Sequence, residues 1–240
     1  TYLPTSADKT YFLPPTLTNG NVHGIIVLNV YNERLLRLLA ETQIPKVFLD
    51  TSSLVAPDEL NGDLLLMESR TSVRRITSHL LEQGRTLPGF IGDIGYAQSN
   101  RERYEGFCQA LTDAGKKVDS SLCLTTPLGI DTYREEIDTF LSSLSRMPDA
   151  FVCASDYVAC ILMQLLEKRG LRVPEDVAVS GFDNNTEDLL AEHLTTVQVF
   201  NEELGARLAL QILYRIKYPN TPHEVTYLGT NVLYRDSTGD

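Results

Sequence analysis

Short runs of apolar residues alternate along the chain with longer segments in which apolar residues recur every three or four positions. Short, continuous apolar runs are typical of buried parallel strands, and the longer spacing is typical of helices that cover a sheet. The alternation therefore predicts an α/β fold with mostly parallel sheets. The expected strands lie near residues 24–28, 46–49, 90–91, 122–124, 151–154, 177–179, 195–197, 225–228 and 232–234. Apolar stripes predict helices around 35–39, 73–81, 99–115 and 137–144, and two further helices are expected over 156–170 and 202–218.

The first 22 residues are looser, with Pro4, Pro14, Pro15 and Gly20 in a mostly polar stretch. This composition predicts one short strand and an exposed connection. A doubly wound domain normally begins with a buried strand that leads into a helix, and nothing before residue 24 fits that pattern. We therefore expect the first strand and helix of the fold to be missing from this chain.

Composition argues for a binding role rather than catalysis. The formal net charge is −11, so the surface as a whole should repel phosphate backbones. The four cysteines form no Cys-x-x-Cys pair and the four histidines no i, i+4 pair, so we expect no metal and no cofactor. Gly89, Gly92 and Gly95 have the wrong spacing for a dinucleotide loop, and no nucleophile elbow or Walker loop occurs. We expect a protein that is not an enzyme.

No apolar run reaches the roughly 18 residues of a membrane span, and no basic-then-apolar leader opens the chain. We therefore expect a cytoplasmic protein with no membrane partner.

Seven segments, in family order across about 220 residues, resemble the effector-binding core of LacI/GalR-type transcriptional regulators. The main ones are AFVCASDYVA at 150–159 and KRGLRVPEDVAVSGFDN at 168–184. They are joined by VHGII at 22–26 with IPKVFLD at 44–50, by SNRERYEGF at 99–107, and by LTTV at 194–197 with RDST at 235–238.

The resemblance implies a periplasmic-binding-protein-like type I fold, in which two doubly wound parallel-sheet subdomains are joined by three crossover segments. We expect an N-terminal subdomain of residues 1–92 and 201–220, and a C-terminal subdomain of residues 93–200 and 221–240. A small ligand would bind between them, outside the carboxyl ends of the strands. The family's helix-turn-helix domain, which contacts operator DNA, is absent from this chain.

Family members are homodimers, and we expect the dimer to form through the N-terminal subdomain. The helices near 35–39 and 73–81 carry more apolar positions than one sheet needs.

The resemblance also implies the ligand-binding residues. Arg103 falls at the arginine of the family's Ser-x-x-x-Arg-x-x-Gly-Phe motif, where a planar guanidinium suits two adjacent ligand oxygens; the alternative is a surface salt bridge. Asp183 matches an aspartate that accepts hydrogen bonds from sugar hydroxyls or a base; the alternative is a turn or cap. The remaining expected ligand-binding residues are Ser99, Phe182, Ser155, Glu68 and Asn201.

Some positions depart from the family pattern. Ser155 stands where the family usually has asparagine, and Asp156, which follows it, is expected to cap a helix. Glu68 replaces an aspartate. Pro127 or Leu128 occupies a position where relatives often place a stacking aromatic, and tryptophan is absent. These departures weaken the case for a pyranose stacked face-on, although Tyr96, Tyr133 or Phe182 could substitute.

Two function classes share this fold. The first is the ligand-sensing, dimerising core of a repressor or activator whose effector is a sugar or sugar derivative. The second is a solute-binding protein of a sugar transporter. The string RVPEDVAVSGFD over 172–183 favours the regulator.

Overall fold

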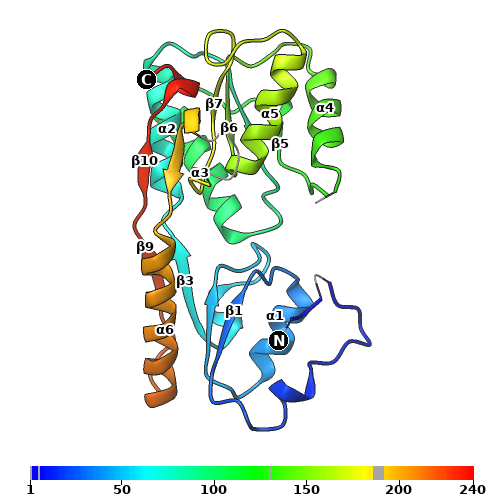
Figure 1. The fold of residues 1–240 in the computed structure, drawn as a ribbon, viewed down its shortest axis with the longest axis vertical. Helices are drawn as coiled ribbons and strands as arrows, with labels where there is room; N and C mark the ends of the chain where they lie inside the picture. Colours follow the sequence, from blue (N-terminus) through cyan, green and yellow to red (C-terminus); the bar gives the residue numbers. More distant parts are fainter. Residues whose placement is uncertain (1, 5, 130, 186–191) are drawn as a thin grey trace. The chain divides into compact units, whose positions relative to one another are not determined.

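The computed structural model describes residues 2–4, 6–129, 131–185 and 192–240. The chain divides into two compact units, and Figure 1 labels most of their helices and strands. Unit 1 comprises Thr1–Met67, Tyr96–Ser99 and Phe200–Gly229. Unit 2 comprises Glu68–Gly95, Asn100–Val199 and Thr230–Asp240.

These units differ from the subdomain boundaries expected from the sequence, because residues 68–92 group with unit 2 and residues 221–229 with unit 1. Helical contacts explain the first difference: Nε of Arg74 donates to Asp113 at 2.6 Å, and the Ser72 and Thr230 hydroxyls lie 2.9 Å apart. Strand pairing explains the second, because Val225 pairs with Leu64 in the sheet of unit 1.

Unit 1 contains a four-stranded, wholly parallel sheet in the order β1-β2-β3-β9. Its strands are β1 (Ile25–Leu28), β2 (Lys46–Leu49), β3 (Asp63–Met67) and β9 (Val225–Leu228). Its helices are α1 (Glu33–Glu41) and α6 (Asn201–Lys217), with 3-10 turns at Pro15–Leu17 and Pro57–Leu60.

The core of unit 1 lies between α1 and the sheet, where Leu36 and Leu39 belong to the same buried cluster as Phe48 and Leu64. α6 packs on the sheet as well, and its carboxyl-terminal half passes so close to the start of β1 that a Cβ on Gly24 would lie 2.7 Å from Ile216. A larger residue there would require the side-chain end of Ile216 to shift.

Unit 2 contains a second four-stranded parallel sheet, in the order β5-β4-β6-β7. Its strands are β4 (Pro88–Ile91), β5 (Cys123–Leu124), β6 (Ala150–Cys153) and β7 (Ala178–Ser180). β8 (Thr196–Gln198) and β10 (Asn231–Leu233) form a separate antiparallel pair. The helices are α2 (Arg70–Glu82), α3 (Gln98–Asp113), α4 (Tyr133–Ser143) and α5 (Asp156–Lys168), with 3-10 turns at Ser120–Leu122 and Asp236–Thr238. The first two residues of α3 group with unit 1.

Successive side chains of the strands in unit 2 point to opposite faces of the sheet. Ile91 and Phe151 join the buried cluster that α4 and α5 complete, and Figure 1 shows those two helices side by side. Phe90 faces α3, where its ring centroid lies 5.6 Å from that of Phe107. Both faces are therefore covered, which explains why the sequence shows continuous apolar runs rather than alternation.

One sequence expectation is wrong. The described residues before 23 contain no strand, only the 3-10 turn at Pro15–Leu17. Of the apolar positions expected at a dimer surface, Leu35, Leu36, Val73 and Ile76 are each at most 1% exposed and belong to the chain's own core, whereas Leu38 is partly exposed. The dimer itself stays a prediction.

Candidate functional site

In unit 2, polar side chains follow the strands at the carboxyl edge of the sheet. β6 ends at Cys153 and is followed by Ser155, and β7 ends at Ser180 and is followed by Asp183. Parallel strands all end at the same edge, so the segments that follow them lie close together. This edge is where open α/β sheets bind ligands.

Arg103 is held at this edge by three neighbours, although it is only 4% exposed. Its Nη1 donates to the backbone carbonyl of Ala154, and its guanidinium carbon lies 3.7 Å from the centroid of the Phe182 ring. Nη2 lies 3.6 Å from a carboxylate oxygen of Asp183. Nε is buried and has no hydrogen-bond partner among the described residues. Such a donor costs about 1–3 kcal/mol, which a ligand oxygen within its reach would recover.

Asp183 is the acceptor of this cluster, and its side chain is 43% exposed. Its backbone N–H donates to the carbonyl of Val197 at 3.0 Å, and its φ of 109° is unusual for a residue with a side chain. Backbone in such a region costs about 1–3 kcal/mol and concentrates at ligand-binding sites. Partial desolvation raises the pKa of Asp183, while the Arg103 charge opposes the rise.

Phe182 is fully buried, with the Arg103 guanidinium over its ring. A cation over an aromatic face is attracted by the ring quadrupole. This arrangement corrects the expectation of a direct ligand contact, because a stacked ligand would need an open ring face. The structure makes Phe182 a support for Arg103.

Ser155, not Asp156, caps α5: the Ser155 hydroxyl accepts from the backbone N–H of Val158 at 3.3 Å. The expected Asp156 cap is therefore wrong. A serine in extended conformation suits the position before the first helical turn. The Asp156 carboxylate instead accepts from the Thr196 hydroxyl at 2.6 Å and from the backbone N–H of Asn185 at 2.8 Å. Burial raises the pKa of Asp156 to about 6, despite these donors.

Glu68 serves the start of α2. Its carboxylate accepts from the backbone N–H groups of Thr71 and Ser72 and from the Ser72 hydroxyl at 3.1 Å. A carboxylate at a helix amino terminus satisfies N–H groups that have no partner within the helix. Its expected ligand contact stays a prediction.

Two of the expected ligand-binding residues lie in unit 1. Ser99 is buried, and its hydroxyl donates to the Asp50 carboxylate at 2.6 Å. Asn201 is the exposed first residue of α6. The site prediction omitted Asp50, which follows β2 directly with a φ of 60° and is 3% exposed. A polar residue immediately after a buried strand is the sequence signal that marks this edge.

The structure therefore brings Arg103, Asp183 and Phe182 together in unit 2, with Ser155 on the neighbouring segment after β6. Ser99 and Asn201 belong to unit 1, and Glu68 lies at the start of α2.

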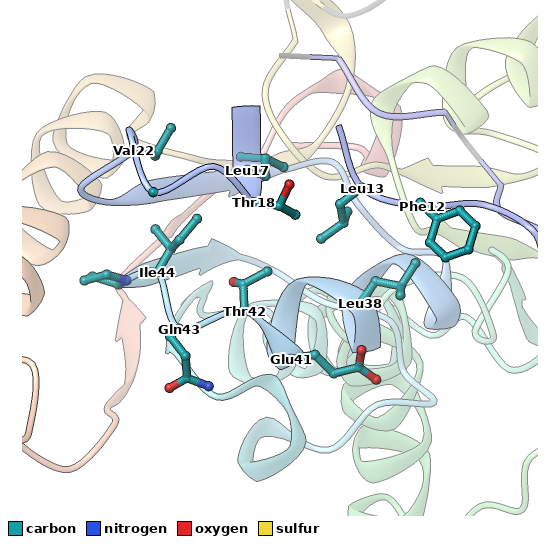
Figure 2. Close-up of a pocket in the computed structure, with 12 residues that line it drawn as sticks. Phe12, Leu13, Leu17, Thr18, Val22, Leu38, Glu41, Thr42, Gln43 and Ile44 are labelled. Atoms are coloured by element: carbon teal, nitrogen blue, oxygen red, sulfur yellow. The ribbon is translucent and has the colours of Figure 1, made fainter. Parts of the chain in front are cut away.

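Figure 2 shows a separate pocket in unit 1, of about 760 Å³, between the segment before β1 and the end of α1. Leu13, Leu17, Leu38 and Ile44 make its lining largely apolar. None of the seven expected site residues lines it.

Among the described residues, no three His, Cys, Asp or Glu side chains are grouped so that they could hold a metal ion. No described helix is both long and apolar enough to cross a membrane.

Two α/β units, each built on a parallel sheet with polar residues at its carboxyl edge, define a binding protein of the periplasmic-binding-protein-like class. Residues 77–238 match the family described as periplasmic binding protein-like domain. The chain belongs to this family, as the effector-binding core of a LacI/GalR-type regulator.

The curated relatives are transcriptional regulators rather than enzymes. The chain is 27% identical to the HTH-type transcriptional repressor PurR of Glaesserella parasuis serovar 5 (strain SH0165), over 85% of this chain and 59% of that protein. It is 31% identical to the HTH-type transcriptional regulator DegA of Bacillus subtilis (strain 168), over 70% of this chain and 48% of that protein. The chain thus spans about six tenths or less of these relatives.

Among solved structures, the transcriptional regulator CelR-cellobiose complex superposes with a TM-score of 0.82 at 27% identity, covering 93% of this chain and 68% of that one. A LacI family regulator from Enterococcus faecium with bound ribose shares the fold, with a TM-score of 0.73 at 22% identity over 92% of this chain and 82% of that one.

Proposed function

We propose that this chain binds a small-molecule effector, a sugar or sugar derivative, and in the complete protein couples its binding to the occupancy of operator DNA. The observation that carries the proposal is the cluster of Arg103 and Asp183. A hydroxyl-rich molecule can donate to the carboxylate and accept from the guanidinium, and both hydrogen bonds are charge-assisted. The half-exposed Asp183 gives a ligand access to this cluster.

Relatives support the ligand class and the regulatory role. The structures named above contain cellobiose and ribose, and the curated relatives carry names of helix-turn-helix regulators. With a net charge of −11 this chain is a poor DNA-binding surface, so we assign operator contact to a separate helix-turn-helix domain.

The resemblance further supports a homodimer in which effector binding changes the spacing of the two DNA-binding domains. Such coupling requires that the effector prefer one arrangement of the protein over another. Analytical ultracentrifugation of the complete protein tests the dimer, which a mass of one chain would refute.

Isothermal titration calorimetry of the complete protein against cellobiose, ribose and other sugars tests the ligand site. Asp183→Asn keeps the size of the side chain and removes its charge, and Arg103→Lys keeps the charge and removes the planar fork. Each should weaken binding of the sugar that the parent binds by about 10- to 100-fold, the loss of a charge-assisted hydrogen-bond set.

The control is Arg172→Lys, which alters the exposed ion pair of Arg172 with Asp176 in the same unit. It should leave affinity unchanged. Undiminished affinity in both site variants would refute the assignment of this cluster, and failure of the parent to bind any sugar would refute the ligand class.

A further inference from the structure

Helix α6 of unit 1, drawn in orange in Figure 1, has apolar side chains on two faces. One face carries Leu204, Leu208 and Ile212, which are buried, and the helix contacts β1 and β2 of the sheet. Leu210 and Leu213 lie on another face and are 62% and 63% exposed. A single exposed leucine is ordinary in a protein surface, but two on neighbouring positions of one helix face form an apolar patch.

The patch belongs to a regular row of exposed residues, which we call the α6 stripe. Its members recur at intervals of three, four, three and four positions: Glu203, Ala206, Leu210, Leu213 and Lys217. This is the spacing of the side chains that meet when two helices pack along each other. The stripe is apolar in the middle, acidic at its first residue and basic at its last.

The charged ends of the α6 stripe are not used inside the chain. Neither Glu203 nor Lys217 forms an ion pair with another described residue, and the Lys217 ammonium lies 5.1 Å from the centroid of the Tyr218 ring. An acid at the start of a helix and a base at its end suit the helix dipole. The dipole does not account for two exposed leucines between them.

We propose that the α6 stripe binds the α6 stripe of a second copy of this chain, with the two helices antiparallel. A two-fold axis at Leu210 places this residue against the partner's Leu210. Glu203 lies seven residues before Leu210 and Lys217 seven residues after it, so Glu203 faces the partner's Lys217 at both ends of the contact. Ala206 and Tyr214 lie four residues to either side, so a small side chain faces a large one.

The distribution of charge favours a second copy in this orientation. A two-fold contact uses the same patch on both chains, so the patch must complement itself. The α6 stripe does so only when the helices are antiparallel, because a parallel pair would bring Glu203 beside the partner's Glu203. Two chains with a net charge of −11 repel each other at a distance, so opposite charges at the contact itself are what would orient them.

This contact is independent of the proposed ligand site and needs no effector. It also differs from the homodimer proposed above, whose expected helices lie near 35–39 and 73–81. The α6 stripe would therefore join two chains, or two such homodimers, through a separate surface of unit 1.

Sedimentation equilibrium of the complete protein, without effector, tests the contact. Leu210→Glu should weaken concentration-dependent association by about 30-fold or more, because it buries a charge at the centre of the interface. Glutamate is a good helix former, so the exposed position should keep its helix. Leu54→Glu is the matched control: the same substitution, at a leucine of unit 1 that is 60% exposed and lies outside α6, should sediment like the parent.

Charge reversal tests the orientation of the helices. Glu203→Lys or Lys217→Glu alone places like charges at both ends of the contact and should weaken association by about tenfold. The double variant should recover the parent's association, because both ion pairs form again with their signs exchanged. An equimolar mixture of the two single variants should also recover it, because each chain then meets a partner of opposite charge. Mixing would not repair a folding defect.

The outcomes separate this inference from the proposed function. Association of Leu210→Glu like that of the parent overturns the α6 contact, and so does a mixture of the two charge variants that stays as weak as each alone. The latter result would mean that a different partner covers the stripe. A fall from four chains to two in Leu210→Glu supports the α6 contact beside the proposed homodimer, and a fall from two to one supports the α6 contact alone. Sugar binding by calorimetry should be the same in all these variants.

Discussion

Replacing Arg215 by methionine should destabilise unit 1 more than any exposed substitution does, because it breaks a fully buried ion pair. Asp63 is 0% exposed and Arg215 is 2% exposed. Arg215 donates to the Asp63 carboxylate from Nε at 3.0 Å and from Nη2. The carboxylate also accepts from the side chain of Gln211 at 2.8 Å and from the backbone N–H of Glu224 at 2.9 Å.

The magnitude follows from what Arg215→Met leaves behind. Asp63 would stay buried with two of its four donors lost, and the carbonyls of Thr221 and Pro222 would each lose a donor from Nη1 or Nη2. Removing one partner of a buried pair costs about 3–5 kcal/mol. A domain is stable by only about 5–15 kcal/mol, so unit 1 should approach unfolding under native conditions.

Hydrogen exchange read by mass spectrometry suits a chain of two units, because a single unfolding midpoint is not defined when units unfold separately. Peptides from β3 and α6 should lose protection in Arg215→Met, while peptides from β6 should keep it. Arg172→Met, at a 69% exposed side chain, should change protection by less than about 1 kcal/mol.

The double variant Asp63→Leu with Arg215→Met should be more stable than Arg215→Met alone, because no buried charge is left unpaired. A loss below about 1 kcal/mol in the single variant, or a double variant as unstable as the sum of both single changes, would refute the reasoning.

Acid should destabilise unit 1 by protonating Asp63 of the same ion pair. Burial alone would raise the pKa of Asp63, but the hydrogen bonds from Arg215, Gln211 and Glu224 lower it below its ordinary 3.8. The stabilisation is therefore complete above about pH 4 and is lost as the pH falls through the lower folded value. Arg215→Met should remove most of this acid dependence.

Three further predictions concern single positions. Burial raises the pKa of Asp156 from 3.8 to about 6, so the folded state holds the proton more tightly and unit 2 should lose on the order of 3 kcal/mol as the pH rises from about 4 to 6.5. The free energy of unfolding, measured by urea titration at several pH values in that range, should change less with pH in Asp156→Asn than in the parent. An equal dependence on pH in both proteins would contradict the assignment. Gly106→Ala should lower the melting temperature at a cost of about 1–3 kcal/mol, because its Cβ would lie 2.2 Å from the backbone oxygen of Arg70; a neutral result in calorimetry would show that the helices can separate at no cost. Gly205→Ala, in α6 with nothing within 4 Å of the added carbon, should stabilise by about 0.5–1 kcal/mol, and a lower melting temperature would contradict the open environment seen here.

The strands that the sequence predicts well are those buried on both faces, such as 46–49 and 151–154, because they form continuous apolar runs. β3 has such a run in 64–67 but was not predicted. Its first residue, Asp63, is a buried charge whose counter-ion, Arg215, lies 152 positions later. Pairings this distant leave no local pattern.

The candidate site divides in the same way. Arg103 and Asp183 belong to recognisable motifs, and the structure brings them together. Which acid or hydroxyl caps a helix is decided by backbone geometry: the backbone of Ser155 is extended, while Asp156 already lies inside α5 and turns to Thr196.

The restraint on Arg103 has a consequence for binding entropy. A flexible arginine at a protein surface must be immobilised when a ligand arrives, at a cost of about 0.5–1.5 kcal/mol. Here the Ala154 carbonyl and the Phe182 ring fix the guanidinium during folding. That part of the cost is thus met before any effector is present. The site should bind with little reorganisation at this side chain, and heating that loosens Phe182 should weaken affinity before unit 2 unfolds.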